Sequence, residues 1–263
     1  MNLGQQVFIL LPVHDRAANI DFFQSLGYIR VADCKAKQSF SVLTDGNTHL
    51  LLDEGYFGSK GIVYYQPLMN ETLATLKDRG CSFCIKNHPN QDSIQATFAD
   101  SNGTKIILSN HAIFQNLPLP VSASSALKIG QLAELSLTTH QMTDSLNFWK
   151  KMGFSCVFYR SWENEEFGSR AILSDGLISI GLHETEQFEG MKLTYLDNEM
   201  PERIIEVKKM GIPTTFEMIP IKKKVFAAVG IEAPNGTELY LFKRRNYLDL
   251  MHFPDDKQKR ISA

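Results

Sequence analysis

The sequence contains one series of motifs twice, and this repeat limits the folds open to the chain. Residues 22–28 (FFQSLGY) return at 148–154 (FWKKMGF), residues 43–46 (LTDG) at 173–176 (LSDG), and residues 102–104 (NGT) at 235–237. The separations are 126, 130 and 133 residues, so the order is kept and only short loops differ in length. A period this long exceeds that of solenoid repeats and indicates two copies of one compact module. We expect positions that agree between the copies to serve the fold, and positions that differ to carry function.

Composition and charge narrow the class of protein. With 263 residues, of which 43% are hydrophobic and 21% charged, the chain is typical of a globular protein with two domains of ordinary size. A formal net charge of −2 gives no electrostatic basis for binding nucleic acid or an anionic membrane. The first residues lack the features of a secretory signal, and no apolar run reaches the roughly 20 residues of a membrane span. These features predict a cytoplasmic protein whose partner is neither nucleic acid nor a membrane.

Both copies begin with a predicted strand followed by an amphipathic helix. In the first copy an apolar strand spans 7–13, Asp15 is the expected N-cap, and Gly27 ends the helix. In the second copy the strand spans 132–139, Thr143 is the expected N-cap, and Gly153 ends the helix. The expected core positions of the two helices are separated by 126 residues and are Ile20, Phe23, Leu26, Leu146, Trp149 and Met152.

The remainder of each copy predicts strands around a second helix. Asp-Gly pairs at 45–46 and 175–176 predict hairpins within 40–53 and 170–184. Strands at 62–65 and 192–196 lead into helices at 71–79 and 201–210, and final hairpins turn at 102–103 and 235–236. Each copy is thus expected to follow the order β-α-β-β-β-α-β-β. We expect modules at 1–110 and 131–245, a linker containing Pro and Ser at 111–130, and a tail at 246–263.

These motifs resemble one known superfamily. A strand, a helix ending in the pattern F-[FYW]-x-x-[LM]-G-[FY], an Asp-Gly hairpin and a strand after Asn-Gly-Thr are similar to the vicinal oxygen chelate superfamily. That group includes lactoylglutathione lyase, extradiol ring-cleaving dioxygenases and bleomycin-resistance proteins, and the resemblance covers about residues 6–109 and 131–243. It implies an α+β fold of two tandem βαβββ-type modules, with curved, mostly antiparallel sheets around a cleft and helices on the convex side. It implies no single activity, because one fold can host many chemistries.

The resemblance also implies a divalent metal in the cleft, held by residues of the first strand, a middle strand and the last strand. In the first copy the first- and last-strand positions fall on Phe8 and Ile107, neither of which binds a metal. In the second copy the positions fall on Glu134 and Tyr240, with the middle-strand position near Lys192. One carboxylate, one phenol and one ammonium do not form a site for a hard divalent cation. We therefore expect no metal ligands and no cofactor, with a divalent metal as the alternative.

Alternation along the strands assigns one face of each sheet to the cleft. This face is apolar in the first copy, whereas in the second it carries polar and aromatic side chains, as small-molecule sites do. We expect Glu134 to be a ligand anchor or a general base, with His183 as its proton partner in a catalytic pair. Glu134 could instead face solvent or pair with Lys192. The expected ligand-binding residues are Ser136, Thr138, Lys192, Tyr240 and Phe242.

Three functions remain open from the sequence. The first, which the polar second cleft favours, is a metal-free protein of the bleomycin-resistance kind that binds an aromatic or amphipathic small molecule. The second is a metal-dependent lyase, isomerase or extradiol-type dioxygenase. The third is a non-catalytic interaction module whose clefts are filled by side chains or by the C-terminal tail. In each case we expect a monomer or a homodimer.

Overall fold

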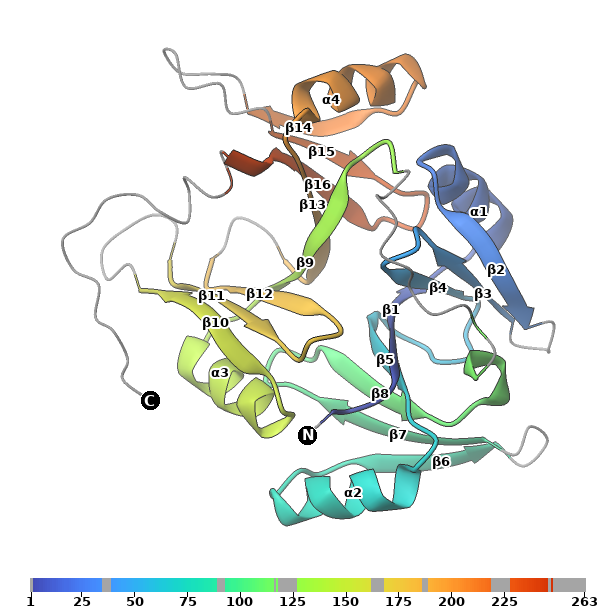
Figure 1. Cartoon of the computed structure of the whole chain (residues 1–263), viewed down its shortest axis with the longest axis vertical. Helices are drawn as coiled ribbons and strands as arrows, with labels where there is room; N and C mark the ends of the chain where they lie inside the picture. Colours follow the sequence, from blue (N-terminus) through green and yellow to red (C-terminus); the bar gives the residue numbers. More distant parts are fainter. Residues whose placement is uncertain are drawn as a thin grey trace.

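The protein folds into two modules with the same order of elements (Figure 1). The computed structural model describes residues 2–34, 39–88, 93–115, 117, 127–161, 168–185, 189–218, 228–245 and 247. The first module contains β1 (Gln6–Pro12), α1 (Arg16–Ser25), β2 (Ile29–Cys34), β3 (Phe40–Thr44), β4 (His49–Asp53), β5 (Gly61–Tyr65), α2 (Met69–Asp78), β6 (Cys84–His88), β7 (Ser93–Ala99) and β8 (Lys105–Ser109). The second contains β9 (Gln131–Thr138), α3 (Met142–Lys151), β10 (Ser155–Arg160), β11 (Arg170–Ser174), β12 (Ser179–His183), β13 (Met191–Asp197), α4 (Met200–Lys209), β14 (Thr214–Met218), β15 (Ala228–Glu232) and β16 (Glu238–Lys243).

Each module is one eight-stranded sheet made of two consecutive βαβββ units. The strand order is β2-β3-β4-β1-β5-β8-β7-β6 in the first module and β10-β11-β12-β9-β13-β16-β15-β14 in the second. In the first sheet β1 runs parallel to β4 and β5 parallel to β8, while the other neighbours are antiparallel. The second sheet repeats these pairings. The predicted α+β fold of two tandem modules with mostly antiparallel sheets is therefore confirmed.

The structure adds four strands that the hydrophobic pattern does not predict. β2 and β6 form the two edges of the first sheet, and β10 and β14 form the edges of the second. Every side chain of β2 and β10 is at least partly exposed, including the large apolar Ile29 and Val157. Edge strands of this kind bury no complete face, so their sequences carry no clear alternation. The observed order of each module is β-α-β-β-β-β-α-β-β-β.

The starts of the two equivalent helices differ. Asp15 is the N-cap of α1, as predicted, and its carboxylate accepts a hydrogen bond from the Ala18 amide at 2.9 Å. The prediction of Thr143 as the N-cap of α3 is wrong, because the helix begins at Met142. The carboxylate of Glu184 accepts from the Met142 amide at 3.3 Å and so takes the place of a local cap. Within the described ranges, no helix is both long and apolar enough to cross a membrane.

The helices pack on one face of each sheet, and the apolar side chains of both helix-bearing faces form one continuous core. Leu11 from the first sheet and Leu137 from the second belong to this core, as does Trp149 of α3. In Figure 1, α2 and α4 lie on the outer side of their sheets, next to β6–β7 and β14–β15. The predicted core positions Ile20, Phe23, Leu26, Trp149 and Met152 are buried, and Leu146 packs against them partly buried.

Hydrogen bonds join the modules within this shared core. The Tyr28 and Tyr195 hydroxyls lie 2.7 Å apart and are buried. The Tyr64 hydroxyl donates to the Asp175 carboxylate at 2.6 Å. The two halves of one chain therefore contact each other directly, through side chains that lie more than 100 residues apart.

The opposite face of the first sheet is filled by aromatic side chains. Phe8 and Phe40 from the sheet pack with Phe57 and with Phe114 of a short 3-10 helix (Ala112–Phe114). The Phe114 ring is fully buried and lies 4.5 Å from the Phe8 ring and 5.9 Å from the Phe40 ring, measured between centroids. The beginning of the segment expected to be a linker thus covers this face of the first sheet, and we call the resulting apolar cluster the plug.

Candidate functional site

Glu134 lies at the centre of the equivalent face of the second sheet. It occupies the middle of β9 and pairs with Thr194 of β13. Leu132 precedes it in the strand, and Leu135 and Leu137 follow it. Leu135 and Leu137 enter the helix-side core, so the alternation of the strand turns Glu134 to the opposite face of the sheet. Its side chain is only 1% exposed.

Four side chains donate hydrogen bonds to the Glu134 carboxylate. Oε1 accepts from Ser136 at 2.8 Å, from the Arg170 guanidinium at 3.1 Å and from His183 Nε2 at 2.9 Å. Oε2 accepts from Arg170 at 3.2 Å and from the Tyr247 hydroxyl at 2.6 Å. We refer to Glu134, Ser136, Arg170, His183 and Tyr247 as the polar cluster. Because a carboxylate only accepts, the His183 nitrogen that faces it carries a proton.

The polar cluster keeps Glu134 ionised. Burial by itself raises the pKa of the carboxyl group, but the Arg170 charge and the hydrogen bonds from His183 and Tyr247 together hold that pKa well below its usual value. The pKa of His183 is lowered by burial and by Arg170, which outweigh the attraction of Glu134. At neutral pH the cluster is therefore a Glu–Arg ion pair with a neutral imidazole. A carboxylate with so low a pKa is a weak base, so the geometry suits an anchor better than a general base.

Tyr247 reaches the cluster from the segment after β16. Its ring lies over the Arg170 guanidinium, 4.6 Å from centroid to carbon, and its hydroxyl accepts a hydrogen bond from Arg170 while donating to Glu134. The residue is 5% exposed, and this burial raises the pKa of its phenol. The nearby charge of Glu134 raises the same pKa further. The beginning of the predicted tail thus forms part of the site.

Gly181 makes room for this arrangement. It lies on β12 in register with Ser136 of β9, and a methyl group on its α-carbon would overlap all three atoms of the Glu134 carboxylate group. Its equivalent in the first module is Leu51, which belongs to the apolar plug. A glycine at this position is therefore coupled to the carboxylate that packs against it.

The repeat relates three members of the polar cluster to aromatic residues of the first module, whereas His183 corresponds to the buried Asp53. The sheet registers relate Glu134 to Phe8 and Arg170 to Phe40. The separation of 133 residues between the Asn-Gly-Thr turns relates Tyr247 to Phe114. All three first-module rings pack in the plug. The same position in the same fold is thus filled by rings in one copy and by a buried ion pair in the other.

The structure brings together only some of the residues predicted for the site. Glu134, His183 and Ser136 meet in the polar cluster, and Ser136 also contacts the Thr194 hydroxyl at 2.7 Å. Thr138 accepts from the Gly190 amide at 2.9 Å, at the end of the strand.

The other predicted residues lie beside the cluster. Lys192 pairs with Glu238 of β16, so the alternative in which Lys192 neutralises Glu134 is wrong, and Arg170 takes that role. The ring centroids of Tyr240 and Phe242 are 6.4 Å apart and form an aromatic wall, and Phe242 lies 6.0 Å from Tyr247. Burial, and then the Glu238 charge, raise the pKa of Tyr240 to about 12.

Sequence reasoning missed Arg170 and Tyr247. Arg170 is the first residue of a predicted strand, where a charged side chain is usually solvated, and Tyr247 was assigned to the tail. One signal was available for Tyr247. The separation of 133 residues that relates the two Asn-Gly-Thr turns also relates Phe114 to Tyr247.

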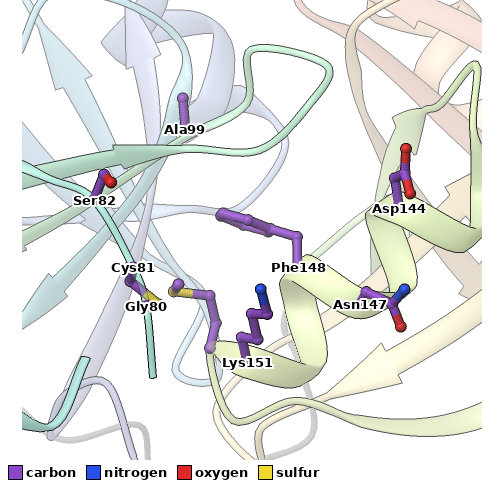
Figure 2. Close-up of a pocket in the computed structure, with 9 residues that line it drawn as sticks. Gly80, Cys81, Ser82, Ala99, Asp144, Asn147, Phe148 and Lys151 are labelled. Atoms are coloured by element: carbon purple, nitrogen blue, oxygen red, sulfur yellow. The ribbon is translucent and has the colours of Figure 1, made fainter. Parts of the chain in front are cut away.

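A separate pocket lies between the modules. It has a volume of about 430 Å³ and is lined by residues 80–82 and Ala99 of the first module and by α3 of the second. Figure 2 shows Phe148 extending from α3 toward the first module, with Asp144 and Asn147 farther along the helix. Its lining residues do not converge on one buried polar group, so we place the candidate site at the polar cluster.

The residues at the metal positions implied by the resemblance do not fit a divalent cation. The single carboxylate, Glu134, already carries a guanidinium on both of its oxygens, and Thr194 and Tyr240 flank it on the neighbouring strands. Within the part of the chain that the structure describes, no three His, Cys, Asp or Glu side chains lie close enough together to hold a metal ion. The cluster supplies its own positive charge through Arg170.

Solved structures share this fold. A catechol 2,3-dioxygenase matches with a TM-score of 0.61 and 12% identity, over 92% of this chain and 88% of that chain. A variant of homoprotocatechuate 2,3-dioxygenase from B. fuscum, in complex with HPCA, matches with a TM-score of 0.60 and 14% identity, over 92% and 71% of the two chains. A mutant of 4-hydroxymandelate synthase from Streptomyces coelicolor matches with a TM-score of 0.61 and 12% identity, over 92% and 93%.

These matches show that the chain shares the fold of these proteins, as the resemblance implies. No protein-family model matches the sequence, and no curated protein matches it. At 12–14% identity the likeness establishes architecture and leaves activity to be argued from the site.

Proposed function

We propose that the protein binds a small molecule in the cleft of its second module without using a metal. The polar cluster anchors the ligand, and the aromatic wall of Tyr240 and Phe242 packs beside it. Ser136, Thr138 and Lys192 line the polar side of the same cleft. The proposal includes a cytoplasmic location and a monomer or a homodimer. A monomer is sufficient because both modules already meet within one chain.

The observation that carries this proposal is the contrast between the two copies. Replacing a buried ion pair by well-packed apolar residues is often neutral or stabilising, by up to about 4 kcal/mol. The first module shows that this fold accepts such a replacement, with Phe8 and Phe40 where the second has Glu134 and Arg170. A polar cluster that stability does not require is best explained by recognition of a ligand.

The roles of the residues follow from their charges. Glu134 accepts hydrogen bonds from four side chains, so it anchors the ligand chiefly by positioning Arg170, His183 and Tyr247. Arg170 Nε is buried and has no hydrogen-bond partner among the described residues, which leaves a donor for a ligand oxygen. His183 remains a predicted proton partner, should the site also catalyse a reaction.

The proposal is tested by a ligand screen on metal-depleted, full-length protein. Aromatic and amphipathic compounds are screened by thermal shift, and stabilising compounds are confirmed by isothermal titration calorimetry. The triple substitution Glu134→Phe, Arg170→Phe and Gly181→Leu copies the plug of the first module into the second, and we expect it to fold and to lose binding. Phe8→Leu, at the position equivalent to Glu134, is the matched control and should bind as the wild type does. Equal binding by the triple variant, or no binding by the wild type, would refute the proposal.

A metal-dependent dioxygenase is the second candidate, because dioxygenases are among the matched structures. Under this candidate Glu134 would be the carboxylate that holds the metal, and it would no longer be paired with Arg170. Elemental analysis of protein expressed with added Fe, Mn, Zn and Ni separates the candidates. About one metal per chain, lost in Glu134→Gln, would favour the enzyme over the metal-free binding protein.

A further inference from the structure

We propose that Tyr247 is a displaceable plug of the second cleft, which competes with the ligand for the polar cluster. This inference rests on the proposed function, since a plug matters only where a ligand enters. It concerns the regulation of that site by the segment after β16.

The two modules close their clefts by equivalent residues that are held in different ways. Phe114 is surrounded by rings, with Phe8, Phe40, Phe57 and Tyr65 within 6.3 Å of its centroid. A ring in such surroundings has no favourable alternative in water. The first cleft is therefore permanently closed.

Tyr247 is held by polar contacts in addition to apolar packing, which it makes in a small cluster with Leu196, Ala133, Phe158, Ile172 and Phe242. Its hydroxyl bonds to Glu134 and Arg170, its ring lies on the guanidinium, and Phe242, at 6.0 Å, is the neighbouring ring. Hydrogen bonds of this kind are exchanged for bonds to water or to a ligand at a small net cost, unlike apolar burial. The hydrogen bonds that hold Tyr247 are thus ones that the polar group of a ligand can replace, and an aromatic ligand can replace its apolar contacts.

The cluster also remains satisfied when Tyr247 leaves. Glu134 Oε1 keeps Ser136, Arg170 and His183, and Oε2 keeps Arg170 at 3.2 Å. No buried charge is left without a partner, which would be the main penalty against opening. The ion pair thus stays in place when Tyr247 leaves, and the departure of Tyr247 exposes the pair to a ligand.

A competing plug lowers the apparent affinity of the site. The apparent dissociation constant is the intrinsic one divided by the fraction of molecules in which the cleft is open. If the seated state is favoured by tenfold to a hundredfold, removing the tyrosine tightens binding by about the same factor.

The first experiment needs no ligand. Native full-length protein is treated with tetranitromethane, and nitration of each tyrosine is followed by peptide mass spectrometry. Tyr28 and Tyr64, which are buried in the shared core, set the rate for locked phenols, and the exposed Tyr159 sets the rate for free ones. We expect Tyr247, although buried, to react at least about tenfold faster than Tyr28. A rate equal to that of Tyr28 would overturn the plug.

The second experiment uses 4-nitrophenol, chosen because it presents the same phenol as Tyr247. We expect Tyr247→Ala to bind it at least about tenfold more tightly than the wild type does, whereas Tyr159→Ala, on the far face of the sheet, should match the wild type. Equal affinities of wild type and Tyr247→Ala would overturn the competition. Absence of binding in both contradicts the proposed function, and the nitration rates then decide on the plug separately.

Discussion

Arg170→Met isolates the energetic role of the buried ion pair. The substitution keeps most of the side-chain volume and, among the described residues, removes the only full positive charge bonded to Glu134. Glu134 is 1% exposed, so it loses two charge-assisted hydrogen bonds without gaining water. Removing one partner of a buried pair costs about 3–5 kcal/mol of unfolding free energy, because the other charge is left uncompensated.

The variant should also invert the pH dependence that Glu134 contributes. In the wild type the pKa of Glu134 is lower when folded than when unfolded. Its stabilisation is therefore present above the unfolded value and is lost as the pH falls through the folded one. Without Arg170, burial dominates and raises the folded pKa above the unfolded one. Stability of the variant should then fall as the pH rises through that interval.

Urea unfolding at several pH values between about 4 and 8 measures both effects. The gap in unfolding free energy between wild type and Arg170→Met should widen with rising pH. Lys208→Met, which removes the cation of the exposed pair with Glu217, is the matched control and should shift the urea midpoint little at any pH. A gap that is small or constant with pH would refute the argument that Arg170 neutralises a buried carboxylate.

Three further predictions concern packing and capping. Gly181→Ala should cost about 1–3 kcal/mol of unfolding free energy, because its methyl group overlaps the Glu134 carboxylate. The cost should be clearly smaller in a Glu134→Ala background, and urea unfolding of the wild type, the two single variants and the double variant measures it. Phe114→Ala should cost about 3–5 kcal/mol by leaving a cavity in the first plug, measured the same way, and a loss below 1 kcal/mol would contradict its placement. Asp15→Ala should cost about 0.5–2 kcal/mol because it removes a bonded N-cap, whereas Gln141→Ala, at the equivalent cap without a side-chain bond, should change the thermal midpoint much less.

The fold was largely predictable because the repeat supplied two readings of each element. Helix ends at Gly27 and Gly153 and hairpins at the Asp-Gly and Asn-Gly pairs appear where they were expected. The edge strands escaped prediction, since strands such as β2 and β10 gain their hydrogen bonds from one neighbour and bury no complete face. The boundaries drawn between modules, linker and tail stay predictions.

The site was predictable in position and only partly in composition. Strand alternation correctly placed Glu134, Ser136 and His183 on the cleft face. The partner of Glu134 could not be deduced, because Arg170 comes from a strand two places away in the sheet and meets it only through the tertiary fold. Because Arg170 pairs it, Glu134 has a lowered pKa in spite of its burial.

The continuous helix-side core has a consequence for how the chain can be divided. Suppose that the chain is cut within 118–126 and the two halves are expressed separately. The first half would then expose its part of the core with Tyr28, and the second half would expose its part with Tyr195. Neither half should be an autonomous folding unit, and denaturation of the intact chain should be a single cooperative transition. The first module, although its own cleft is closed, would then serve as an obligate folding partner that keeps the second cleft in shape.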